Sequence, residues 1–311
     1  MFKGEDFMKR ISGDKVIYEF TENLKPVETV KSGETVIFEA NDCFYQQLRK
    51  DGATIEDINM AHVNPATGPV EIEGAEVGDL LAVTIEKVDL DDFGTALCEP
   101  GHGVLGSLKF DRAQRDIPIE GGYAIFSDDI KIPLNPMVGV IGVASKAGNG
   151  SWQNAIPWKH GGNMDTTVIK EGSTLYLPVG QAGAMFALGD CHACMGDGEM
   201  SFAALEIKGD VTVSFELIKN KGKDVEWPFI VHDGKISFLV SAETGDQASF
   251  KAAEVAINHI AKALNTSFEE AYILGSLAVD LEVSQLVNPM KTYRATISQE
   301  VLSLDKLIGS L

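Results

Sequence analysis

Short segments in which apolar and polar residues alternate fill the chain from about residue 14 to 240, and they constrain the fold more than any other feature. Alternation with a period of two, in segments rich in Val, Ile, Thr, Phe and Tyr, is typical of strands with one buried face. Five such segments are 15–20, 35–40, 80–90, 174–179 and 210–217. Because glycine-containing turns separate them, we predict a strand-rich body.

The sequence pattern changes after Ser241. Between 244 and 264 apolar residues recur every three or four positions, which predicts a helix with one buried face. Thr266, with Glu269 three positions later, has the form of a capping box and predicts a second helix that ends near 278. Two closing strands are expected at 280–287 and 292–298. The predicted fold class is mainly β (β-rich α+β), with a C-terminal helical segment that returns to the sheet.

The chain contains no low-complexity linker and no repeat of fixed period, so we expect one domain over 14–311. Its strand-rich body covers about 14–240 and its helix-containing part 241–311. Residues 1–13 are interpreted as an N-terminal extension, and the sequence does not decide whether 1–7 are native.

The balance of charges disfavours two classes of partner. Against 26 Lys and Arg stand 46 Asp and Glu, giving a net charge of −20 that repels nucleic acids and anionic lipid surfaces. Neither an apolar segment of signal-peptide length near the start nor a run of about 18 apolar residues is present. We therefore expect a cytoplasmic protein with no nucleic-acid or membrane partner. Four cysteines in so long a chain do not resemble a disulfide framework, which agrees with a reducing compartment.

The segment 187–199, ALGDCHACMGDGE, concentrates acids, a histidine and cysteines around glycines. If its first half continues a strand, Asp190 and His192 lie on the same face, because side chains alternate along a strand. A carboxylate oxygen and an imidazole nitrogen together suit zinc or a related divalent cation. Asp197 and Glu199 repeat the two-residue spacing after the glycine turn. The alternative from these residues alone is a solvated acidic hairpin.

Cys191 and Cys194 offer competing interpretations of the same segment. Their C-x-x-C spacing occurs in redox and zinc sites, but no second pair is present and the surroundings are not those of a thioredoxin-like motif. A working dithiol, metal ligation by one sulfur and ordinary buried thiols remain open. A thiolate nucleophile with His192 as its base is disfavoured, because Cys191 and His192 point to opposite faces of a strand.

A second segment rich in ligating groups is the predicted loop 158–167, WKHGGNMDTT. It places His160, Asn163 and Asp165 around a Gly-Gly pair, and loops of this kind often carry functional sites. The alternative is a glycine turn in which the aspartate caps its own backbone.

Several blocks of the chain resemble, in order, the acetamidase/formamidase family of amide hydrolases. The resemblance covers about residues 30–298, and its sharpest parts are G-D-x-H at 189–192, G-D-G-E at 196–199 and H-G-G-N-x-D at 160–165. It implies a β-rich fold with appended helices, a divalent metal, a homo-oligomer (dimer or higher), and hydrolysis of small linear amides such as formamide or acetamide to a carboxylate and ammonia. Zinc is the first expectation for the metal, with calcium or another ion as alternatives. Cys191 and Cys194 depart from the family pattern and are left without a role.

The resemblance also assigns roles to individual residues. Asp190, His192 and Asp165 are expected to hold the metal. The remaining assignments are Glu199 as the catalytic proton shuttle, His160 and Asn163 as substrate-binding residues, and Asp197 as an additional ligand or a partner that orients His192. Alternative functions are hydrolysis of a cyclic amide, lactam or imide, and a metal-binding or ligand-binding β-protein without turnover.

Overall fold

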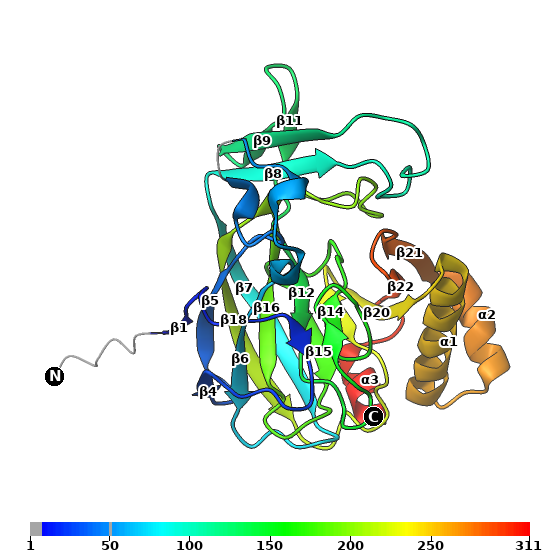
Figure 1. The fold of residues 1–311 in the computed structure, drawn as a ribbon. Coiled ribbons are helices and arrows are strands. Elements are labelled where there is room, and N and C mark those ends of the chain that lie inside the picture. Colours follow the sequence, from blue (N-terminus) through cyan, green and yellow to red (C-terminus); the bar gives the residue numbers. More distant parts are fainter. Residues whose placement is uncertain (1–7, 50–51) are drawn as a thin grey trace.

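Two large β-sheets pack face to face in the computed structural model, which describes residues 8–49 and 52–311 (Figure 1). Within these ranges nine strands form the first sheet. In spatial order they are β1 (Lys9–Ile11), β5 (Thr35–Ala40), β18 (Gly209–Ile218), β7 (Leu80–Leu90), β15 (Thr174–Pro178), β19 (Phe229–His232), β20 (Lys235–Ala242), β22 (Lys291–Ser298) and β21 (Val279–Gln285).

The second sheet contains eleven strands of the described part of the chain. Its main path is β11 (Lys131–Pro133), β10 (Tyr123–Ile125), β9 (Ala113–Glu120), β8 (Phe93–Cys98), β17 (Glu206–Ile207), β16 (Phe186–His192), β12 (Met137–Gly142) and β14 (Gly161–Asn163). Strand β6 (Ala66–Ile72) pairs with β16, and β2 (Val16–Ile17) and β4 (Glu28–Val30) pair with β6. A separate pair joins β3 (Glu19–Phe20) to β13 (Trp152–Gln153).

Buried side chains from both sheets form the main hydrophobic core. Phe38 of β5 and Phe215 of β18 in the first sheet meet Phe186 of β16 in the second, with ring centroids 5.6 and 5.1 Å from that of Phe186. Strands β8, β9, β10 and β11 form one end of the second sheet, at the top of Figure 1, and Ile117 of β9 and Ala124 of β10 still belong to this core.

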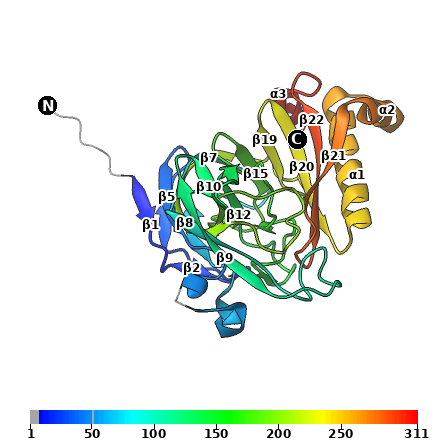
Figure 2. The same ribbon diagram turned by 90° about the horizontal axis from the view of Figure 1, so that it is seen from above.

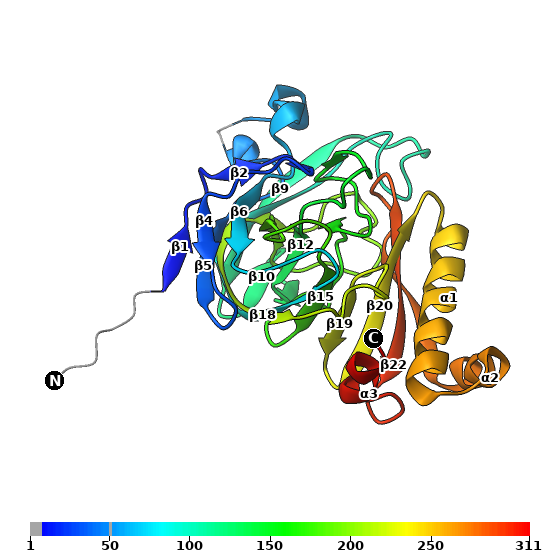
Figure 3. The same cartoon turned by 90° about the horizontal axis from the view of Figure 1, so that it is seen from below.

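The helices lie at the opposite side of the molecule from β1 and β5, as the views from above (Figure 2) and below (Figure 3) show. Helix α1 (Gly245–Leu264) packs on β20 and β22 through its buried stripe, and α2 (Phe268–Ala278) packs on α1. Helix α3 (Leu304–Ser310) also contacts α1. Short 3-10 helices are η1 (Gln47–Arg49), η2 (Ile55–Asp57) and η3 (Met60–His62).

The predicted fold class is confirmed, since the described chain is rich in strands and its helical segment returns to the first sheet through β21 and β22. Segments 35–40, 80–90, 174–179 and 210–217 match β5, β7, β15 and β18 to within one residue. The segment 15–20 instead divides into β2 and β3, because its two halves pair with different partners, β6 and β13.

Two boundaries differ from the prediction. Ser267, not Thr266, caps α2 by accepting a hydrogen bond from the Glu270 amide. Thr266 is already engaged at the end of α1, where its amide donates to the Ala261 carbonyl oxygen. Part of the predicted extension 1–13 is also structured, because Lys9–Ile11 form β1 and pair in parallel with β5, whereas 1–7 lie outside the described residues.

Among the described helices, none combines the length and apolarity that crossing a membrane requires.

Candidate metal centre and active site

Strand β16 supplies the centre of the site, and all seven of its residues are buried. As the strand pattern predicts, Asp190 and His192 are neighbours, with Asp190 Oδ1 3.3 Å from His192 Nε2. Val138 of β12 pairs with Cys191 and Val140 with Gly189, so that Gly139 is the residue of β12 that lies opposite Asp190.

Two further carboxylates approach the same imidazole nitrogen. His192 Nε2 lies 3.4 Å from Glu206 Oε2 and 3.8 Å from Asp165 Oδ1. Glu206 belongs to β17 and pairs directly with His192 across the sheet, while Asp165 follows β14. Three segments that are distant in the sequence therefore direct acids at one histidine.

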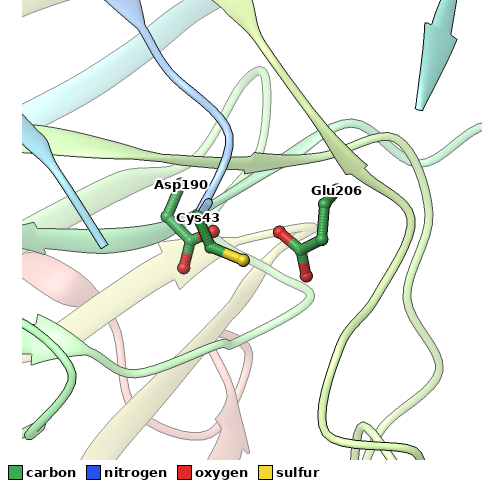
Figure 4. Close-up of side chains that lie close together, drawn as sticks. All are labelled: Cys43, Asp190 and Glu206. Carbon is green, nitrogen blue, oxygen red and sulfur yellow. The ribbon is translucent and has the colours of Figure 1, made fainter. Parts of the chain in front are cut away.

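The acidic side chains divide into two groups that can each hold a cation. In the first, ligand atoms of Asp165, His192 and Glu199 all lie within 4.8 Å of one another. In the second group, ligand atoms of Cys43, Asp190 and Glu206 likewise all lie within 4.8 Å of one another. These three side chains point toward a common space (Figure 4). The groups are adjacent because Asp190 and Glu206 both lie against His192. We call these six residues the carboxylate cluster.

Three acids of the carboxylate cluster have left-handed backbone conformations. The φ angles are 37° at Asp165, 59° at Asp190 and 47° at Glu199. Residues other than glycine rarely adopt such angles, and backbone strain of this kind concentrates at functional sites. The conformations therefore support a functional site rather than a solvated hairpin.

Burial leaves the cluster short of positive charge. Each of its four carboxylates is at most 6% exposed. Within the described ranges His192 is the only ion-pair partner of three of them, and Glu199 has none. Burial raises the pKa of Asp165, and it raises the pKa values of Asp190 and Glu199 well above their ordinary range.

The pKa values of His192 and of the fourth carboxylate, Glu206, shift in response to each other's charge. Burial by itself would lower the pKa of His192, but the charges of Glu206 and Asp190 outweigh it and raise that pKa well above its ordinary value. Burial would likewise raise the pKa of Glu206, but the neighbouring imidazolium lowers it. A single imidazolium cannot balance four carboxylates, so the cluster is suited to a divalent cation.

Buried polar atoms without hydrogen-bond partners test whether these residues fit a metal. One side-chain atom in each of Asp165, Asp190, His192, Glu199 and Glu206 is buried without a hydrogen-bond partner. Beneath them lies Gly139, where a Cβ atom would stand 2.5 Å from Asp165 Oδ1 and 2.8 Å from Asp190 Oδ2. The glycine thus lets both carboxylates approach the backbone of β12. Buried oxygen and nitrogen donors without partners, with the Cys43 sulfur close to Asp190 and Glu206, fit a bound divalent metal.

The segment between β21 and β22 holds the cluster from outside. Asn288 Nδ2 donates to Asp165 Oδ2 at 2.6 Å and to the Asn163 carbonyl oxygen at 2.9 Å. The Gly198 amide donates to the Ser284 carbonyl oxygen at 2.8 Å, which fastens the turn that carries Glu199. Partners of this kind orient metal ligands in other proteins.

Asp197 has a different environment from Glu199. It is more exposed, and its carboxylate accepts hydrogen bonds from Arg294 (2.5 and 3.1 Å) and Thr167 (2.8 Å). Among the described residues no polar contact joins it to His192. Its position is thus that of an anchor for the glycine turn, and the predicted role as a ligand or as a partner of His192 has no contact to support it.

The two predicted substrate-binding residues are separated. Asn163 pairs with Val140 in β12, close to Asp165, and its side-chain oxygen is buried without a partner. The His160 carbonyl oxygen accepts a hydrogen bond from the amide of Val143. Val143 lies five residues along the chain from Val138, which pairs with Cys191. The backbone of His160 thus lies three residues farther along β12 than Asn163, and its ring lines a cavity whose lining includes no residue of the carboxylate cluster.

The two cysteines of the C-x-x-C pattern do not join the cluster. Cys191 is fully buried in the main core, and burial raises the pKa of its thiol to about 12. Cys194 packs against the same core, and burial also raises its pKa. Neither thiol has the low pKa that a nucleophilic or redox cysteine requires.

Sequence reasoning missed four contributors: Cys43, Gly139, Glu206 and Asn288. Glu206 carried a signal, since it is a lone acid between Leu205 and Ile207 in an apolar segment. Cys43, Gly139 and Asn288 carried none, because only the pairing of distant segments brings them to the site.

Comparison with known proteins agrees with the resemblance found in the sequence. The chain matches the Acetamidase/Formamidase family over residues 12–155 and 143–303, and it belongs to that family. The fold is similar to that of an acetamidase from Bacillus halodurans, with a TM-score of 0.90, 39% identity, and coverage of 94% of this chain and 97% of that one. A predicted acetamidase/formamidase from Thermoanaerobacter tengcongensis gives a TM-score of 0.91 and 37% identity, covering 95% and 97%.

Curated relatives are more distant and longer. A formamidase of Methylophilus methylotrophus is 26% identical over 255 residues, which cover 64% of this chain and 63% of that protein. The chain spans 63 to 64% of the length of the curated relatives that it matches.

Proposed function

We propose that this protein is a metal-dependent amidohydrolase that cleaves the C–N bond of small linear amides, such as formamide or acetamide, to a carboxylate and ammonia. The observation that carries the proposal is the carboxylate cluster at the family's G-D-x-H and G-D-G-E motifs, with five buried atoms that lack hydrogen-bond partners. The names of the related acetamidases and formamidase support the substrate class.

The residues that hold the metal in this proposal are Asp165, Asp190 and His192, with Cys43 and Glu206 beside them. Zinc is the proposed ion, because nitrogen and sulfur donors accompany the carboxylates, whereas calcium prefers oxygen ligands alone. When bound, a divalent cation supplies Lewis acidity that stabilises the negative charge developing on the amide oxygen.

Glu199 is the proposed proton shuttle. Its Oε2 atom is buried without a partner, and burial followed by the charge of Asp165 raises its pKa well above the ordinary value. A carboxyl group whose pKa is raised can take a proton from the attacking water and deliver it to the departing nitrogen, which is otherwise a poor leaving group.

Asn163 is the proposed substrate-binding residue. Its free side-chain oxygen can accept a hydrogen bond from the amide –NH2 group, and Asn288 fixes its backbone beside Asp165. His160 is given no contact with the reacting amide in this proposal, because its ring lines a cavity whose lining includes no residue of the carboxylate cluster.

We propose a cytoplasmic homo-oligomer as the working form. The four cysteines are free thiols, which agrees with a reducing compartment. On α2, Tyr272 and Ile273 are each 60% exposed and Leu277 is 81% exposed, and an apolar helix surface of this kind favours contact with a second copy.

Ammonia release from formamide and acetamide tests the proposed activity. Glu199→Gln should fold and bind metal yet release ammonia at least about 100-fold more slowly, as expected for a lost acid or base. Glu300→Gln, which alters an exposed acid, is the matched control and should have normal activity. Near-normal turnover by Glu199→Gln would remove that residue from the role. No release from any amide by folded, metal-loaded protein would exclude the hydrolase.

A further inference from the structure

A cavity of about 590 Å³ lies at the His160 end of β12, away from the carboxylate cluster. Its walls come from the turn after β6, the segments after β12 and β13, and the loops that follow β15 and β18. Pockets of 300 to 1,000 Å³ are of the size that binds small molecules. The proposed amidase chemistry uses none of this cavity.

His160 is the unsatisfied polar group of the cavity. It is 5% exposed, and neither ring nitrogen has a hydrogen-bond partner. Ser145, the other buried polar residue of the lining, already donates to the Gly150 carbonyl oxygen. Burial lowers the pKa of His160 to about 3, so the neutral ring offers one N–H donor and one acceptor nitrogen.

The charges of the lining favour an anion. Its two acids already have cationic partners: Asp224 is 2.5 Å from Lys262, and Glu226 is 2.5 Å from Lys159. Lys146 and Lys223 line the same cavity and make no ion pair within the described parts of the chain. This excess of positive charge stands out in a chain whose net charge is −20.

The aromatic wall favours a planar apolar body. Trp152 and Trp158 stack with ring centroids 5.3 Å apart and an angle of 16° between the rings, and Trp227 meets Trp158 edge-on at 4.9 Å. These are the only tryptophans in the sequence. Trp152 and Trp158 line the cavity and Trp227 contacts Trp158, so tryptophan fluorescence reports on this part of the molecule.

We propose that this cavity is a second ligand site, which takes a small organic monocarboxylate with a planar apolar body. The carboxylate pairs with Lys146 and Lys223, the planar body packs against Trp152 and Trp158, and the His160 ring hydrogen-bonds a polar atom of the ligand. Binding at this site does not require turnover at the cluster.

Titration with benzoate, followed by tryptophan fluorescence excited at long wavelength and by calorimetry, tests the proposal. Benzoate should give a saturable change in fluorescence and in heat. Benzyl alcohol, which has the ring without the charge, and acetate, which has the charge without the ring, should each bind at least about tenfold more weakly. This is the effect expected when a charge-assisted hydrogen bond or the apolar contact is lost. No saturable change with benzoate, or equal affinity for benzyl alcohol, would overturn it.

Substitutions in the cavity and in the carboxylate cluster test where benzoate binds. Lys146→Gln and Lys223→Gln should each weaken benzoate binding about tenfold, roughly one charged hydrogen bond, while the exposed control Lys306→Gln leaves it unchanged. Asp190→Asn, which disrupts the carboxylate cluster, should keep the fluorescence response, so this test can succeed or fail independently of the amidase proposal. Unchanged affinity in the folded double lysine variant, or loss of the response in folded Asp190→Asn, would refute a separate site.

Discussion

A methyl group added at Gly139 tests whether the positions of Asp165 and Asp190, which pack against this glycine, are those of metal ligands. In Gly139→Ala the new Cβ atom would stand 2.5 Å from Asp165 Oδ1, 2.8 Å from Asp190 Oδ2 and 3.0 Å from the Asp190 carbonyl oxygen. Real Cβ atoms essentially never approach other atoms within 3.0 Å, so two proposed ligands must move.

The required movement sets the size of the effect. To regain ordinary contact at 3.4 Å, Asp165 Oδ1 must retreat by about 0.9 Å. Metal–ligand distances tolerate deviations of only about 0.2 Å. We therefore expect metal affinity to fall about 10- to 100-fold and activity to fall about 100-fold, the cost of a 1 Å misplacement. Overpacking should cost about 1–3 kcal/mol in the free energy of unfolding, so the variant should fold.

Metal content after dialysis against a weak chelator, ammonia release and thermal melting are the assays. Gly196→Ala is the matched control, because it adds the same methyl group within the G-D-G-E turn where nothing lies within 4 Å. The control should keep its metal and its activity. Wild-type metal content and turnover in Gly139→Ala would refute the assignment of Asp165 and Asp190 as ligands.

Three further predictions concern the surroundings of the cluster. Asn288→Ala removes the 2.6 Å hydrogen bond to Asp165 and should lower metal affinity at least about tenfold. Competition with a chromophoric chelator measures this affinity, and an unchanged value would contradict the positioning role of Asn288. Cys43→Ser should reduce metal affinity, whereas Cys191→Ser, in the core, should leave metal content and activity unaltered. Equal effects of the two substitutions would argue against a ligand group formed by Cys43, Asp190 and Glu206. Metal removal should lower the melting temperature, because an ion that binds only the folded state stabilises it, and a melting curve insensitive to metal would speak against the site.

Local pattern predicted the parts of the site that lie within one element. The two-residue spacing of Asp190 and His192 specified a shared face because side chains alternate along a strand, and the structure places their ligand atoms 3.3 Å apart. The same logic did not extend to Asp197 and Glu199, because they lie in a turn after β16 and not in a strand, and the two side chains enter different environments.

Local sequence pattern did not predict the site residues that come from distant segments of the chain. Glu206 reaches His192 through pairing of β17 with β16, and Asn288 reaches Asp165 from a segment 123 residues away. Their placement depends on sheet order and register, which alternation within one segment does not specify. His160 illustrates the converse, since it is three residues from Asn163 in sequence and yet lines a separate cavity.

The most direct test of the central claim combines elemental analysis with ammonia release on one preparation. The account predicts at least one divalent metal ion per chain, loss of formamide or acetamide hydrolysis when the metal is removed from protein that stays folded, and recovery when zinc is returned. Full activity after complete, verified metal removal would contradict it.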